Sequence, residues 1–152
     1  MPAVSTDRIE KEIVINAPRS RVWKALTDAR QFGEWFGCDL RGQFAPGTTV
    51  SGKITSKGFD HLTIDFEVER IDPETYFSYR WHPYPMDLTI DYSKEPTTLV
   101  EFRLEEVDGG TRLTTVESGF DRLAAGRRDE AFRMNDGGWT SQMKRIEKYV
   151  TR

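Results

Sequence analysis

Residues 97–120 read TTLVEFRLEEVDGGTRLTTVESGF, and this stretch decides the fold. In its first half Val100, Phe102 and Leu104 alternate with polar residues, and a period of two is typical of a β-strand. The residues at 108–110 are Asp, Gly and Gly, a tight-turn signal, and a second alternating stretch follows them. The segment therefore predicts a hairpin of two antiparallel strands.

Four other segments show the same alternation. They are residues 8–16, 49–54, 62–68 and 77–82. Turn signals separate them, since "APGT" precedes the second segment and "DPET" precedes the fourth. The first segment predicts an N-terminal strand, and the other three combine with the hairpin to predict an antiparallel meander.

Two short helices are predicted between the first and second strands. One begins at about Pro18, a residue that the first helical turn tolerates. Asp28 followed three residues later by Gln31 resembles a capping box, so a second helix starts there and ends at Gly37. This second helix carries three large aromatic residues, Phe32, Trp35 and Phe36.

The last part of the chain returns to helical spacing. Between residues 127 and 150 one apolar stripe is formed by Trp139, Met143, Ile146 and Val150. A long helix of this kind buries its stripe by lying across one face of a curved sheet. The predicted fold class is therefore α+β, with some space between sheet and helix.

Composition limits the function classes. The 152 residues predict one domain, 1–152 with a core of about 8–150, and 22 basic against 25 acidic residues argue against a nucleic-acid partner. No run approaches the roughly 18 apolar residues of a membrane span. The single cysteine, Cys38, excludes an internal disulfide. We expect a soluble, cytoplasmic protein.

Four segments in order carry a resemblance to a known family. They are "APRSRVWKALTDARQFGEWFG", "YRWHP", the hairpin quoted above and "NDGGWTSQMKRIEKYV". Over about residues 8–150 the chain resembles the START-like (SRPBCC) superfamily, which includes the birch pollen allergen and the polyketide cyclases. Within it, the chain is similar to the C-terminal domain of the activator of the heat-shock chaperone ATPase. The resemblance implies a helix-grip fold, in which the sheet wraps around the C-terminal helix and leaves an apolar cavity.

We therefore expect the protein to bind a small hydrophobic or amphipathic molecule between the sheet and the C-terminal helix. Most of the expected ligand contacts are aromatic. The full set is Phe32, Trp35, Phe36, Phe66, Tyr79, Trp81, His82, Phe102, Glu117, Asn135, Trp139 and Met143. Of the aromatics on the second short helix, we expect Phe32 and Trp35 to turn inward and Phe36 to lie nearer the entrance.

Two other functions stay open from the sequence. One is a co-chaperone-like module of the stress response that binds a partner protein and stimulates a chaperone ATPase. The other is a cyclase- or hydrolase-like enzyme that uses His82, Glu117 or an Asp of the 82–96 loop. We expect no metal and no cofactor, because the only histidines are His61 and His82 and no nucleotide-binding glycine motif occurs.

Two details are undecided by periodicity. In the strand at 111–118 either face could be buried, and the family pattern suggests that Glu117 faces the cavity. A buried carboxylate needs partners, and Arg80 or Arg112 could serve. The glycines at 137–138 allow either close packing of helix on sheet or the approach of a ligand.

Overall fold

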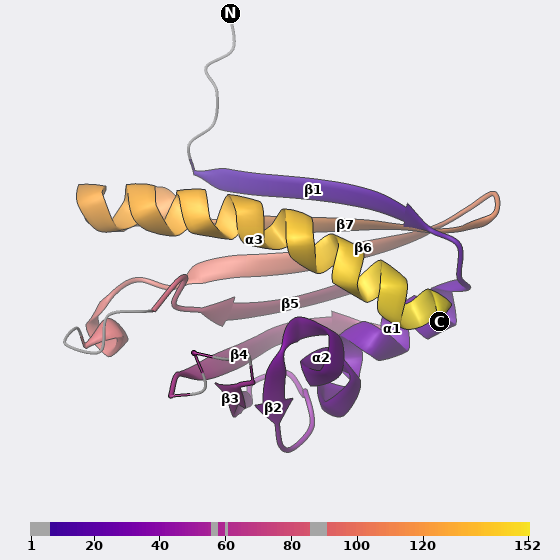
Figure 1. Cartoon of the computed structure of the whole chain (residues 1–152), viewed down its shortest axis with the longest axis horizontal. Coiled ribbons are helices and arrows are strands. Elements are labelled where there is room, and N and C mark those ends of the chain that lie inside the picture. The colour runs from indigo at the N-terminus through magenta and orange to yellow at the C-terminus, as the bar shows by residue number, and fades with distance from the viewer. Residues whose placement is uncertain (1–6, 56–57, 60, 86–90) are drawn as a thin grey trace, which may run out of the picture.

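The computed structural model describes residues 7–55, 58–59, 61–85 and 91–152 and shows one curved antiparallel sheet (Figure 1). The strands follow the spatial order β1-β7-β6-β5-β4-β3-β2. Their bounds are β1 Arg8–Ile15, β2 Cys38–Leu40, β3 Thr49–Ile54, β4 Thr63–Asp72, β5 Tyr76–Trp81, β6 Thr98–Val107 and β7 Gly110–Ser118. The helices are α1 Arg19–Thr27, α2 Ala29–Phe36 and α3 Ala125–Thr151, with 3-10 turns η1 Tyr92–Lys94 and η2 Phe120–Arg122.

The hairpin predicted from residues 97–120 is confirmed. β6 and β7 pair along their whole length, and the pair Val107 with Gly110 closes a two-residue turn. β1 then pairs antiparallel with β7 and forms one edge of the sheet. The other edge is β2, which the sequence did not predict, because three residues are too few to show a period.

The first short helix begins where the sequence predicted, after Pro18, and the second begins and ends as predicted, between Asp28 and Gly37. The side chain of Asp28 accepts a hydrogen bond from the backbone N–H of Gln31 at 3.0 Å, which caps α2. Gly37 ends α2 in the left-handed conformation, with φ 101°. The indole N–H of Trp35 donates to the backbone oxygen of Ala25 at 2.8 Å, so α2 is fixed against α1.

The long helix α3 lies across one face of the sheet, as the helix-grip fold requires (Figure 1). Its predicted stripe is buried, whereas Lys144, Arg145 and Lys148 are exposed. Between α2 and the sheet the core is largely aromatic. Phe32 lies at the centre of this cluster, with ring centroids 4.8 Å from Trp35, 5.4 Å from Phe66 and 5.5 Å from Phe44.

One glycine positions α2 on the edge strand. A Cβ built on Gly33 would lie 2.3 Å from the backbone oxygen of Cys38, the first residue of β2. We predict that Gly33→Ala destabilises the protein by about 1 to 3 kcal/mol, because backbone or helix must shift. For a chain of this length, thermal unfolding followed by circular dichroism then shows a Tm lower by roughly 3 to 10 °C.

The matched control is Gly137→Ala in α3. A Cβ at Gly137 meets no atom within 4 Å, so the substitution gains helix propensity, about 1 kcal/mol, without a clash. An equal rise in Tm for both variants contradicts the close contact between α2 and β2.

Candidate functional site

The Glu117 side chain is the polar centre of the space between sheet and helix. It points from β7 toward α3 and has no solvent exposure. One carboxylate oxygen, Oε1, accepts hydrogen bonds from Asn135 Nδ2 at 2.9 Å and from Trp139 Nε1 at 2.8 Å. The family-based expectation that Glu117 faces inward is therefore correct.

The second oxygen, Oε2, is bonded to the sheet. It accepts hydrogen bonds from Trp81 Nε1 at 2.7 Å and from Thr98 Oγ1 at 2.6 Å. All four donors are neutral, and they come from β5, β6 and α3. Burial raises the pKa of Glu117, because desolvation disfavours the charged form, while the four hydrogen bonds act in the opposite direction.

The prediction that Arg80 or Arg112 pairs with Glu117 is wrong. Arg80 lies 3.0 Å from Glu69, and Arg112 lies 3.1 Å from Glu105, each pair formed outside the core. The reason is the alternation of the strands. Arg80 and Arg112 are flanked by the inward-facing residues of their strands, so their own side chains point to the other face.

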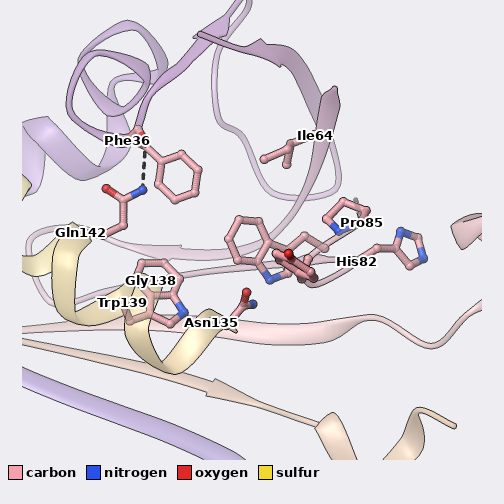
Figure 2. A pocket seen from close by; sticks show the side chains of 10 residues that line it. Phe36, Ile64, His82, Pro85, Asn135, Gly138, Trp139 and Gln142 are labelled. Carbon is pink, nitrogen blue, oxygen red and sulfur yellow. Dashed lines mark hydrogen bonds between the residues drawn. The ribbon is translucent and has the colours of Figure 1, made fainter. Parts of the chain in front are cut away.

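A partly open pocket of about 160 Å³ lies next to this carboxylate, between the end of β5 and the middle of α3 (Figure 2). It is lined by Phe36, Ile64, Trp81, His82, Tyr84, Pro85, Asn135, Gly138, Trp139 and Gln142. Three of these residues, Trp81, Asn135 and Trp139, also donate to Glu117. The wall of the pocket and the buried carboxylate thus form one hydrogen-bonded unit.

Two features of α3 keep the pocket open. A Cβ at Gly138 would meet no atom within 4 Å, so the glycine pair does not serve close packing against the sheet. Gln142, one turn later, turns toward α2, where its Nε2 donates to the backbone oxygen of Phe36 at 3.0 Å (Figure 2). This bond fixes the distance between α2 and α3 at the rim.

The structure brings five of the twelve predicted site residues to the pocket: Phe36, Trp81, His82, Asn135 and Trp139. The other seven do not line it. Phe32, Trp35, Phe66, Tyr79, Phe102 and Met143 are buried in the core, and Glu117 lies beneath the pocket wall. As expected, Phe32 and Trp35 are turned inward and Phe36, 9% exposed, lies nearest the opening.

Five lining residues were not among the predicted contacts: Ile64, Tyr84, Pro85, Gly138 and Gln142. Gly138 had been singled out as a place where a ligand could approach α3. Ile64 belonged to the inner face of a predicted strand and could have been included. Tyr84 and Pro85 lie in an irregular segment, where no periodicity indicates direction.

The segment after β5 is anchored to the start of α3. His82 Nε2 lies 3.2 Å from the backbone oxygen of Glu95, and the Glu95 carboxylate lies 3.1 Å from Arg127 Nε. Arg127 also donates to the backbone oxygen of Pro83. Of the loop aspartates named as catalytic candidates, Asp87 lies outside the described residues and Asp91 caps η1 by accepting from the Ser93 backbone N–H. The enzymatic role stays a prediction.

The described residues contain neither a metal site nor a membrane-spanning helix. No three His, Cys, Asp or Glu side chains in that part of the chain gather as metal ligands. None of its helices is long and apolar enough to cross a lipid bilayer.

The family assignment comes from a match over residues 16–151 to the model described as "Activator of Hsp90 ATPase homolog 1-like protein". The chain belongs to this family. The match covers the two short helices, the sheet from β2 to β7 and α3, and so includes β5, β6, β7 and α3, which form the Glu117 site. A comparison with curated proteins gives no match.

Solved structures of other proteins share the fold. Protein MLL2253 from Mesorhizobium loti is similar with a TM-score of 0.75 and 23% identity, over 95% of this chain and 97% of that one. The Aha1 dimer from Colwellia psychrerythraea is similar with a TM-score of 0.69 and 18% identity, over 94% and 95%. At these identities the likeness shows the helix-grip fold alone.

The raised pKa of Glu117 predicts a pH dependence. A carboxyl group with a higher pKa in the folded state holds its proton more tightly there, so stability falls as pH rises from the ordinary value of 4.5 through the folded value. We expect the stability of the wild type relative to Glu117→Gln to fall as pH rises above 4.5. Urea unfolding of both proteins at each pH measures this. Hydrogen bonds lost in the variant change its free energy of unfolding by the same amount at every pH. A difference between the two free energies of unfolding that does not vary with pH contradicts the prediction.

Proposed function

We propose that this protein binds a small hydrophobic or amphipathic molecule in the pocket between β5 and α3. The observation that carries the proposal is the pocket itself, whose wall is largely aromatic and includes few polar side chains, those of His82, Asn135 and Gln142 among them. Ligand sites typically combine an apolar wall with a small number of placed polar groups.

The size of the pocket limits the part of the ligand that enters. About 160 Å³ is close to the roughly 150 Å³ of an engineered apolar cavity that holds one benzene molecule. A single ring or a branched group of that size fits, and the rest of a longer molecule extends through the open side.

The polar groups of the pocket leave some hydrogen-bonding capacity for a ligand. Asn135 donates to Glu117 through Nδ2, which leaves its carbonyl oxygen as an acceptor. The side-chain oxygen of Gln142 is buried and has no hydrogen-bond partner among the described residues. These two amides sit one on each side of Gly138 along α3. The Asn135 oxygen therefore matches an amphipathic ligand with a hydrogen-bond donor, whereas the buried Gln142 oxygen is closed to such a ligand.

Gly138 supplies the test. We predict that Gly138→Leu abolishes ligand binding, because the new side chain takes up space in the pocket that no protein atom occupies. Binding is measured by the change in Trp81 and Trp139 fluorescence across a panel of lipids, flavonoids and small aromatic compounds. Native mass spectrometry of protein purified from its source identifies a retained molecule.

The control is Gly137→Leu, which also has open space but does not line the pocket. We expect it to bind the same compounds as the wild type. The absence of any fluorescence change across the panel, with no retained molecule, rules out the proposed function.

The family match favours a second candidate, stimulation of a chaperone ATPase. Its structural support is a row of exposed basic residues along the C-terminal half of α3. The row is formed by Lys144, Arg145 and Lys148 and continues at Arg152, just after the helix. Such a row suits an acidic surface on a partner protein.

We predict that charge reversal of this row, Lys144→Glu with Lys148→Glu, lowers the stimulation of a purified Hsp90-class ATPase. Arg41→Glu is the control, because Arg41 is equally exposed but follows β2, away from α3. The readout is ATP turnover at low salt, where electrostatic attraction is strongest. If the wild-type protein does not change the rate of ATP turnover by the chaperone, this candidate function is eliminated.

A further inference from the structure

Glu117 is a buried acidic group with no cationic partner in the described part of the chain. Its four hydrogen-bond donors are neutral, and it takes part in none of the ion pairs described. Two indole N–H groups and an amide NH₂ can only donate, and an ionised carboxylate supplies an acceptor position for every donor present. Above the raised pKa of Glu117, this bonding pattern suits a negative charge, and the described residues give that charge no counter-ion.

The pocket next to Glu117 does not supply that counter-ion. None of the described lining residues is Lys or Arg. The one lining residue that can become positive is His82, and its Nε2 faces a backbone carbonyl of the neighbouring loop. Two guanidinium groups contact the backbone of the rim. Arg145 lies 3.4 Å from the Phe36 backbone oxygen but is exposed and screened by water. Arg127 donates to the Pro83 backbone oxygen, and its charge is paired with Glu95 at 3.1 Å.

Trp81 and Trp139 connect the Glu117 carboxylate to the pocket wall. Each places its N–H on the carboxylate and its ring in the pocket wall. Hydrogen bonds polarise the groups that make them, and donation to an anion shifts electron density into the indole ring. The faces of Trp81 and Trp139 therefore attract a cation more strongly than free indoles, which are already the best aromatic cation binders.

The pocket wall next to Glu117 is formed by three aromatic rings. Ring centroids of Trp81 and Trp139 are 5.9 Å apart, and Phe36 lies 5.8 Å from Trp81 and 6.3 Å from Trp139. At these separations the three rings pack against one another and form one continuous part of the pocket wall. An anionic head group, such as a carboxylate, would face a buried negative charge at short range without compensation.

Resting on the proposed function, we propose that the pocket selects a monocationic ligand, a protonated amine or quaternary ammonium joined to an apolar body. Glu117 is the specificity-determining residue, and it acts through Trp81 and Trp139 without contacting the ligand. Attraction by the polarised indoles and by the buried carboxylate distinguishes the cation from a neutral molecule of the same shape.

The test compares three probes of similar shape on the wild-type protein. Benzyltrimethylammonium is the cation, neopentylbenzene is its neutral isostere and phenylacetate is an anion. We expect the cation to bind at least about fivefold more tightly than the neutral isostere, the effect of one good cation–π contact. Phenylacetate is expected to bind most weakly. Affinities come from Trp fluorescence titration, with Gly138→Leu as the blocked control.

The outcomes separate the two proposals. Equal or tighter binding of neopentylbenzene or phenylacetate overturns the cation selectivity and leaves ligand binding in the pocket intact. Failure of all three probes to bind overturns the selectivity as well, and it counts against the proposed function only if the wider panel also fails.

Glu117→Gln tests the role of the charge. Glutamine keeps the shape of the side chain but carries no charge, so the ratio of cation to neutral affinity should fall to about one. The ratio is the readout because a merely loosened pocket weakens both probes together. A ratio that stays at the wild-type value contradicts the role of Glu117, and the wild-type comparison stands even if this variant does not fold.

Discussion

One buried carboxylate holds the helix on the sheet. Glu117 on β7 accepts hydrogen bonds from residues of β5, β6 and α3, so four elements meet at its two oxygens. Removing it would leave two indole N–H groups buried without acceptors, and each unsatisfied group costs about 1 to 3 kcal/mol. The same bonds orient the tryptophans of the pocket wall. The stability of the protein and the shape of the pocket therefore both depend on the Glu117 side chain. A substitution that alters one of these two properties at this position also alters the other.

Most of the fold could be predicted because its elements are periodic or marked by turn residues. Local sequence patterns predict the hairpin, the cap at Asp28 and the apolar stripe of α3, and tertiary contacts do not override these patterns. β2 was not predicted, because its three residues form a strand only through pairing with β3, which is a tertiary contact. Its place against α2 depends on Gly33, whose missing side chain leaves no signal in a hydrophobic pattern.

The site was less predictable, since periodicity identifies an inner face but not which inner residues border empty space. Phe66 and Trp81 alternate inward alike, yet only Trp81 reaches the pocket. The partners of Glu117 were sought among arginines because opposite charges are the obvious complement of a carboxylate. The strand alternation that directs Glu117 inward directs Arg112 outward. Tryptophan, usually counted as apolar, supplies half of the hydrogen bonds instead.

The pairing of β1 with β7 has a consequence for how the chain reaches this structure. Thr111 Oγ1 donates to the backbone oxygen of Ala17, a contact between residues 94 positions apart, and the whole of β1 lies along β7. During synthesis from the N-terminus, the first strand emerges long before its only neighbour in the sheet exists. Until then its backbone donors are open to other strands. Completion of the sheet is therefore a late, non-local step, and folding speed is set more by this loop closure than by the helices.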